Sequence, residues 1–186
     1  ELIKTSGNVI FDVKGLVHPP RRVVAFPRFI PSVQGSRGHG KSLYGKVYSF
    51  SDRFKFLQEK APALIVHDAI TRHYKPVEKL RGLRSAKTLN ELERKAVQLA
   101  ETLKEAAGIP WSAIGISGSL LVGLHTLQSD IDPVVYGVES CRKAYAVLEN
   151  LLKAGASRFK PYSRDELQAL FDFRSKDTKM SFEDFE

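Results

Sequence analysis

The sequence is poor in cysteine and has no long apolar run. Cys141 is the one cysteine among 186 residues, so no disulfide can form within the chain, and no group of cysteines and histidines has the spacing of a zinc site. No apolar stretch is long enough to cross a bilayer, and the N-terminus lacks the apolar core of a signal peptide. These absences argue against disulfide-rich, zinc-binding and membrane proteins, and we expect a cytoplasmic protein without a membrane partner.

Acidic residues are scarce relative to basic ones. The chain has 29 Lys and Arg against 21 Asp and Glu, a net charge of +8. Residues 1–60 alone contain 11 of the basic and 4 of the acidic residues. Such a surface is suited to polyanions, although many ordinary soluble proteins are also basic. The composition therefore allows nucleic acid as a partner of the N-terminal third, and the hydrophobic fraction of 42% is enough for a packed core.

The N-terminal part has the residue pattern of β-structure. Residues 8–17 and 22–30 are rich in β-branched and aromatic residues on either side of a Pro-Pro pair, which predicts a hairpin. Further strands are predicted over 43–50 and, as a short strand of buried type, over 63–67. Between them we expect a loop over 31–42 and a short helix from Ser51. Residues 71–87 show only weak periodicity and are predicted to be a linker, so residues 1–86 are expected to form a β-rich basic region.

Residues 87–186 are predicted to form a second domain with several helices. Thr88 and Glu91 match a capping box, and apolar residues then recur at helical spacing until Gly108. Two further helices are expected, one from Ser140 to about residue 155 and one after the capping box at 163–166. The final residues, 181–186, have the pattern of another first helical turn, which suggests that the native chain continues.

The stretch between these helices carries the candidate chemistry. Residues 113–119 predict a strand that ends in a Gly-Ser turn, and residues 129–136 predict a second strand that contains Asp130 and Asp132. Side chains two apart on a strand point to the same face, so both carboxylates should converge there. Two adjacent carboxylates are ligands that suit Mg²⁺ or Mn²⁺. Gly118 and Ser119 offer backbone N–H groups and a hydroxyl to phosphate oxygens, so the stretch predicts a site for a metal-bound nucleoside triphosphate.

A structural explanation of the same residues is also open. Asp-x-Asp is frequent in solvated loops and Gly-Ser is a common turn, so neither alone indicates a site. Pro133 follows Asp132 directly and removes a backbone donor from the second strand, which makes the strand an edge or an irregular one.

The spacing of these motifs resembles that of the DNA polymerase beta-like nucleotidyltransferase superfamily. Gly118-Ser119 is followed, after ten intervening residues, by Asp130-Ile131-Asp132. The fuller runs at 118–126, 129–132 and 134–137 are similar to a group of predicted archaeal nucleotidyltransferases, and the resemblance extends over about residues 89–152. It implies an α/β (α+β) core with a mixed sheet and flanking helices.

The resemblance also implies an activity and roles for residues. The activity would be transfer of a nucleoside monophosphate from a triphosphate such as ATP to an acceptor hydroxyl, with pyrophosphate released. Gly118 and Ser119, together with Ser129, would hold the nucleotide, and Asp130 and Asp132 would bind Mg²⁺ or Mn²⁺. The acceptor and the base of the nucleotide stay open.

The superfamily uses a third carboxylate, normally downstream on a neighbouring strand, and no convincing strand follows here. Asp165, Asp172 and Asp177 fall in or near a predicted helix. Asp12 stands between Phe11 and Val13 in the predicted hairpin and has the required form, so we expect Asp12 to complete the catalytic set with Asp130 and Asp132. A ligand beyond Glu186 is the alternative.

Two other classes of function remain open. One is a nucleic-acid-binding protein that keeps the fold without activity, which the basic N-terminal third and its aromatic residues favour. The other is an antitoxin-like protein with a separate helical partner, which follows from small members of the superfamily.

Overall fold

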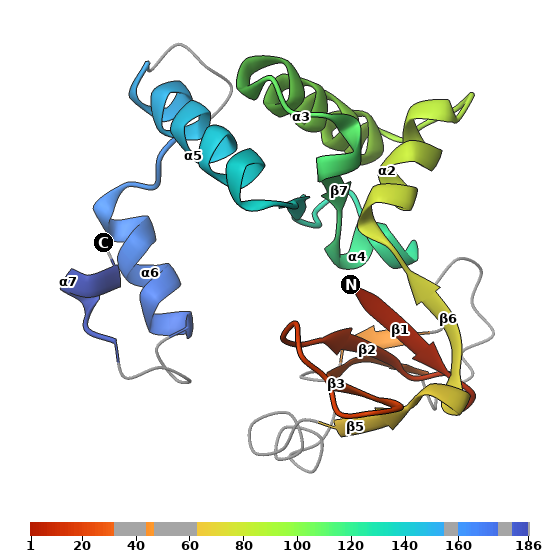
Figure 1. Cartoon of the computed structure of the whole chain (residues 1–186). Coiled ribbons are helices and arrows are strands. Elements are labelled where there is room, and N and C mark those ends of the chain that lie inside the picture. Colours follow the sequence, from red (N-terminus) through yellow and green to blue (C-terminus); the bar gives the residue numbers. More distant parts are fainter. Residues whose placement is uncertain (32–43, 47–62, 155–159, 175–179, 186) are drawn as a thin grey trace. The chain divides into compact units, whose positions relative to one another are not determined.

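The structure is a computed structural model that describes residues 1–31, 44–46, 63–154, 160–174 and 180–185 (Figure 1). It has two compact units, Glu1–Ala144 and Tyr145–Glu186. The first combines a curled antiparallel sheet with helices, so the expected mixed α and β class is confirmed. The loop expected over 31–42, the helix expected after Ser51 and most of the strand expected over 43–50 lie outside the described residues.

Six antiparallel strands form the sheet, in the order β4-β3-β2-β1-β6, with β5 also paired to β3. Their bounds are β1 Leu2–Thr5, β2 Ile10–Val13, β3 Arg22–Pro31, β4 Tyr44–Lys46, β5 Ala63–Val66 and β6 Ile70–Tyr74. The predicted hairpin is confirmed as β2 and β3. The sequence did not predict β1.

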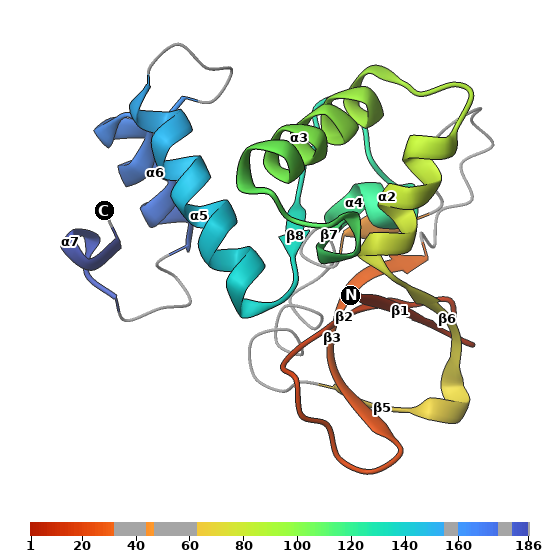
Figure 2. The ribbon, with the colours of Figure 1, turned by 45° about the horizontal axis from the view of Figure 1, so that its top comes forward.

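The sheet curls because one segment joins both of its sides. β5 pairs with β3, the 3₁₀ turn η2 (His67–Ala69) follows, and β6 then pairs with β1 (Figure 2). Register shifts at Lys4/Thr5 and Ile10/Phe11 add local twist. β5 confirms the strand predicted over 63–67, but Leu64 and Val66 are 48% and 47% exposed, so it is not of buried type.

The segment predicted as a linker is wrong in this structure, because it forms β6 and then helix α2 (Pro76–Ser85). Pro76 at the first helical turn has a backbone angle already suited to a helix. The buried residues Pro76, Leu80 and Leu83 recur at spacings of four and three, which is only two turns and therefore a weak signal. Since α2 packs on β7, a strand of the predicted second domain, the expected division at residue 86 does not coincide with the compact units.

Helix α3 (Glu91–Ala107) confirms the helix predicted before the motif, with a shifted start. Asn90, not Thr88, is the N-cap: its side chain accepts the Glu93 N–H at 2.9 Å, and the Glu93 carboxylate accepts the Asn90 N–H at 3.1 Å. Gly108 ends the helix with φ of 60°. The motif region follows as η3 (Trp111–Ala113), β7 (Ile114–Ile116), α4 (Gly118–Val122) and β8 (Pro133–Val135).

Three helices complete the chain: α5 Val138–Lys153, α6 Arg164–Arg174 and α7 Phe182–Phe185. The predicted capping box at the start of α6 is confirmed, since Glu166 accepts the Ser163 N–H at 2.7 Å. The ring of Phe171 lies 5.5 Å from those of Phe182 and Phe185, which joins α6 to α7. The short α7 confirms the final helical turn. None of the helices in the described ranges is long and apolar enough to span a membrane.

Candidate functional site

The site is built on a short antiparallel ladder of β7 and β8. Ile114 pairs with Val135, Gly115 with Val134 and Ile116 with Pro133. Pro133 has no N–H, and beyond it the two chains are joined by the Ser117 N–H, which donates to the Asp132 carbonyl oxygen at 2.8 Å. The second strand is therefore shorter than predicted, and both aspartates precede it. Alternation along a strand consequently does not place Asp130 and Asp132 on a common face.

The two halves of the sequence motif meet at Gly118. This residue begins α4 with φ of +61°, and a Cβ built on it would collide with Oδ2 of Asp132 and lie 2.9 Å from its Cγ. The absence of a side chain at Gly118 thus lets the Asp132 carboxylate approach the backbone. Residues fourteen apart in sequence are brought into contact by the ladder and by α4, whose Leu120 and Leu121 are buried.

Electrostatically, the aspartates are not neutralised by the protein. Both side chains belong to exposed residues, and in the part of the chain that the structure describes neither has an ion-pair partner. Ser119 is half-buried, one position into α4. The hydroxyl of Ser117, the N-cap residue, accepts no capping hydrogen bond. Two carboxylate groups and the polar start of α4 therefore remain available to a ligand.

Asp12 is not brought to this cluster. It lies in β2, opposite Leu2 of β1 and Phe26 of β3, and its Oδ2 accepts from Lys14 Nζ at 2.6 Å. Within the described ranges no group of three or more His, Cys, Asp or Glu side chains could hold a metal ion. The structure thus brings together Gly118 and Asp132 but does not add Asp12 to the aspartate pair.

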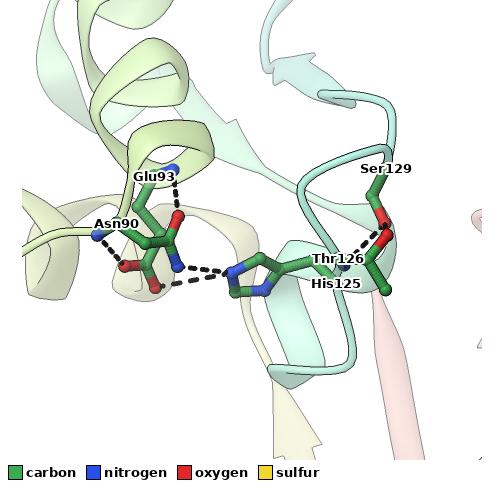
Figure 3. Close-up of polar contacts among 5 residues, drawn as sticks. All are labelled: Asn90, Glu93, His125, Thr126 and Ser129. Atoms are coloured by element: carbon green, nitrogen blue, oxygen red, sulfur yellow. Dashed lines mark hydrogen bonds and ion pairs between the residues drawn. The ribbon is translucent and has the colours of Figure 1, made fainter.

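Ser129 has a role in the loop that leads to the aspartates. Its Oγ accepts the Thr126 N–H at 2.9 Å, and its own N–H donates to the Thr126 carbonyl at 3.1 Å (Figure 3). This reciprocal pair closes the turn directly before Asp130. The hydroxyl that the sequence assigned to the nucleotide therefore contributes to the shape of the loop.

The same loop is attached to the start of α3 through His125. Asn90 Nδ2 lies 2.9 Å from His125 Nε2, and Glu93 Oε1 lies 3.8 Å from the same nitrogen (Figure 3). Asn90 Oδ1 already accepts the Glu93 N–H, so the amide NH₂ faces the imidazole. His125 Nε2 must then accept, which leaves the proton of the neutral ring on Nδ1.

His125 is held in its neutral form by its surroundings. Nδ1 is buried and has no hydrogen-bond partner among the described residues. Burial lowers the pKa of His125; the Glu93 carboxylate opposes this shift, and the positive charge of Lys79 on α2 adds to it. The loop is therefore anchored to α3 by an imidazole that loses its acceptor nitrogen when it is protonated.

The sequence reasoning assigned no function to Asn90, Glu93 or His125. Asn90 and Glu93 do form a capping-box pattern, three residues apart, which was available in the sequence but competed with the overlapping Thr88–Glu91 pattern. Nothing local predicts that His125, 35 positions from Asn90, should meet it. That contact depends on how α4 and its loop fold back toward α3.

Comparison with known proteins gives one relative and no name for a function. An uncharacterized protein of Methanocaldococcus jannaschii is 29% identical over 207 aligned positions, which cover the whole of this chain. The chain spans 60% of the length of that relative. No protein-family model matches the chain, and no solved structure matches it.

Proposed function

We propose that the chain is a metal-dependent nucleotidyltransferase, which transfers a nucleoside monophosphate from a nucleoside triphosphate to an acceptor hydroxyl. The observation that supports this best is the contact of the Asp132 carboxylate with Gly118. It joins the Gly-Ser turn to the Asp-x-Asp motif, the two parts of the sequence whose spacing resembles that of the polymerase beta-like superfamily.

The donor set fits a divalent cation. Asp130 and Asp132 are exposed, lie two positions apart and have no cationic partner within the described residues, so their charge is available to a metal. Carboxylate oxygens are the ligands that Mg²⁺ and Mn²⁺ prefer. When bound, such a metal supplies charge neutralisation for the triphosphate and for the leaving pyrophosphate.

The protein's own groups would position the reactants. Ser119 would donate its hydroxyl hydrogen to a phosphate oxygen, and the Thr126–Ser129 turn would fix the approach of the aspartates. The acceptor oxygen bonds to the α-phosphorus while the bond from that phosphorus to the bridging oxygen breaks. Pyrophosphate leaves, and the proton of the attacking hydroxyl passes to a carboxylate of the pair.

Removal of the aspartate charges tests the proposal. Replacing Asp130 and Asp132 together by Asn should abolish Mn²⁺ binding in calorimetric titrations and leave the fold intact, because the change removes two adjacent negative charges at exposed positions. Asp68→Asn, at an exposed aspartate in η2, is the matched control and should bind Mn²⁺ like the wild type. Undiminished Mn²⁺ binding in the double variant would end the metal-site proposal.

A second candidate is a nucleotide-binding or nucleic-acid-binding protein without transferase activity. It is favoured by one observation, the lack of a third carboxylate beside the pair in the described ranges. Incubation with each labelled triphosphate, Mg²⁺ or Mn²⁺ and candidate acceptors separates the two. Transfer of label supports the enzyme, whereas metal-dependent triphosphate binding without transfer supports the second candidate. Asp12→Asn belongs in the same assay, because a loss of transfer there would identify Asp12 as the missing carboxylate.

A further inference from the structure

A groove runs along α2 at the other end of the β7–β8 ladder. Two adjoining hollows, of about 290 Å³ and 80 Å³, share Val77, Arg81 and Ser112 in their walls. Arg84 and Trp111 line the smaller hollow; Lys75 and Tyr136 line the larger one. Because Trp111–Ala113 precedes β7 and Tyr136 follows β8, the groove is separated from Gly118 and Asp132 by the full length of the ladder.

The charges of the groove differ between its two ends. At the larger hollow, Glu78 lies 3.5 Å from Lys75 and Glu1 lies 2.7 Å from His73, so each carboxylate has a partner. At the Trp111 end, neither Arg81 nor Arg84 has a carboxylate partner among the described residues. Both arginines are exposed. This end therefore presents positive charge that the described part of the protein does not neutralise.

The surrounding sequence adds to this charge. Between residues 71 and 87 a single acidic residue, Glu78, stands among six basic ones, Arg72, Lys75, Lys79, Arg81, Arg84 and Lys87. Lys104 of α3 approaches the same place, with its Nζ 6.0 Å from the centre of the Trp111 ring. A surface of this kind attracts polyanions over distances up to the Debye length.

Arg84 and Trp111 form a stack that suits an aromatic ligand. The guanidinium carbon of Arg84 lies 3.6 Å from the centre of the Trp111 ring, the distance of direct cation–π contact. Trp111 thus supports the guanidinium beneath it, which lowers the entropy lost when Arg84 binds a ligand. Nucleobases stack on guanidinium groups and on aromatic rings, and phosphates pair with free arginines such as Arg81.

We propose that this groove, lined by Lys75, Arg81, Arg84, Trp111 and Tyr136, binds single-stranded nucleic acid. Bases stack at Arg84 and Trp111, and the phosphates contact Arg81 and the neighbouring lysines. An acidic polypeptide would use the same positive charge but would gain nothing from the stacked ring. The proposal is independent of nucleotidyl transfer, because it involves none of the residues at the Asp132 end.

Trp111 is the one tryptophan of the chain, so its fluorescence reports on the groove directly. The assay titrates the 186-residue protein with a labelled uridine-rich RNA of about twelve nucleotides, in EDTA to exclude divalent metals. Anisotropy of the RNA measures affinity, and Trp111 emission measures occupancy of the groove. We expect Trp111 emission to change at the RNA concentrations that raise the anisotropy.

Charge reversal at the groove gives the decisive comparison. Arg81→Glu with Arg84→Glu should weaken RNA binding by about tenfold or more and lower the slope of log affinity against log salt by roughly 1.4, about 0.7 for each lost phosphate contact. The matched control, Arg142→Glu with Lys143→Glu on exposed positions of α5, changes the net charge equally and should retain most of the affinity. Arg81→Gln, a milder change, should give a smaller loss in the same direction.

Trp111 separates nucleic acid from other polyanions. Trp111→Phe should keep most of the affinity and Trp111→Ala should lose roughly tenfold, since stacking needs only an aromatic face. Equal losses in the groove and control variants would overturn the proposal, and so would RNA binding that leaves Trp111 emission unchanged. If polyglutamate shifts the emission as strongly as RNA, the groove belongs to an acidic polypeptide. The Asp130→Asn, Asp132→Asn variant should bind RNA like the wild type, which keeps this test separate from the metal test.

Discussion

The two ends of the β7–β8 ladder present opposite charges. At one end the exposed carboxylates of Asp130 and Asp132 follow a loop anchored to α3, and Asp132 contacts Gly118. At the other end Arg81 and Arg84 flank Trp111. At both ends the protein leaves its charges without ion-pair partners within the described residues. A cation is thus expected at one end and a polyanion at the other.

This comparison shows how a ladder of three residue pairs can separate two functions. The middle pair is Gly115 with Val134. A Cβ on Gly115 would lie 2.5 Å from Pro76 Cβ and 2.6 Å from the Pro76 carbonyl carbon, so α2 rests directly on the strand. Both ends depend on that contact: α2 carries the arginines of the groove, and it places Lys79 near His125.

The largest effect is expected from Gly115→Ala, which should damage both ends at once. The new methyl group meets backbone atoms of α2, which cannot move aside cheaply, so we expect a destabilisation of roughly 1–3 kcal/mol or more. Denaturant unfolding measures it. Gly82→Ala, within α2 and with nothing near its new Cβ, is the control and should instead stabilise by about 0.5–1 kcal/mol. Equal stability of the two variants would show that α2 does not rest on β7 in this way.

A smaller effect, confined to the Asp132 end, is expected from Asn90→Ala. Loss of the N-cap costs about 0.5–2 kcal/mol, and loss of the amide also leaves His125 Nε2 without its donor. Asn90→Ser keeps a capping oxygen and removes only the donor to His125, so it should be destabilised less. Both variants should bind Mn²⁺ more weakly and bind RNA at the α2 groove unchanged. If they altered only RNA binding, the two ends would not be independent.

The smallest effect is the pH dependence that His125 contributes. Its pKa is lowered in the folded protein, first by burial, while Glu93 raises it and Lys79 lowers it further. Between that lowered pKa and the ordinary value of about 6.5 the unfolded chain binds more protons. Stability from this residue is therefore complete above about pH 6.5 and is lost as the pH falls through this window.

His125→Gln isolates this contribution, because glutamine can still accept from Asn90 and does not titrate. The difference in unfolding free energy between wild type and variant should shrink as the pH falls below about 6.5. A difference that stays constant with pH would mean that His125 is not held neutral. Mn²⁺ binding should follow the same trend more steeply in the wild type, since the anchored loop leads to the aspartates.

The sequence predicted the elements whose signals are local. The β2–β3 hairpin, α3 with Gly108 at its end, and α6 with its capping box follow from residue types a few positions apart, because strand propensity and capping act within one turn or one strand. The motif halves at Gly118 and Asp132 were also recognised from their spacing. Their direct contact could only be expected, since it depends on Ser117 pairing with Asp132 across the ladder.

Other features required the tertiary structure. β1 and β6 are short strands whose pairing partners lie far away in sequence, and α2 is short enough that its buried residues give little periodicity. The expectation that Asp12 lies beside Asp130 rested on residue form alone, and β2 instead sets Asp12 beside Lys14. Similarly, Trp111 and Arg84 are 27 positions apart, and no local rule predicts that they stack.

The sequence by itself determined which residues could carry chemistry: the charges, the glycines at tight turns and the caps of the helices are properties of single positions and their near neighbours. The tertiary structure alone decided which of them meet. Packing of α2 against Gly115 and of α4 into the core brings remote groups within contact distance, and burial then sets their energetics, as it does for His125. Such contacts arise from the balance of packing over the whole unit, which no short stretch of sequence contains.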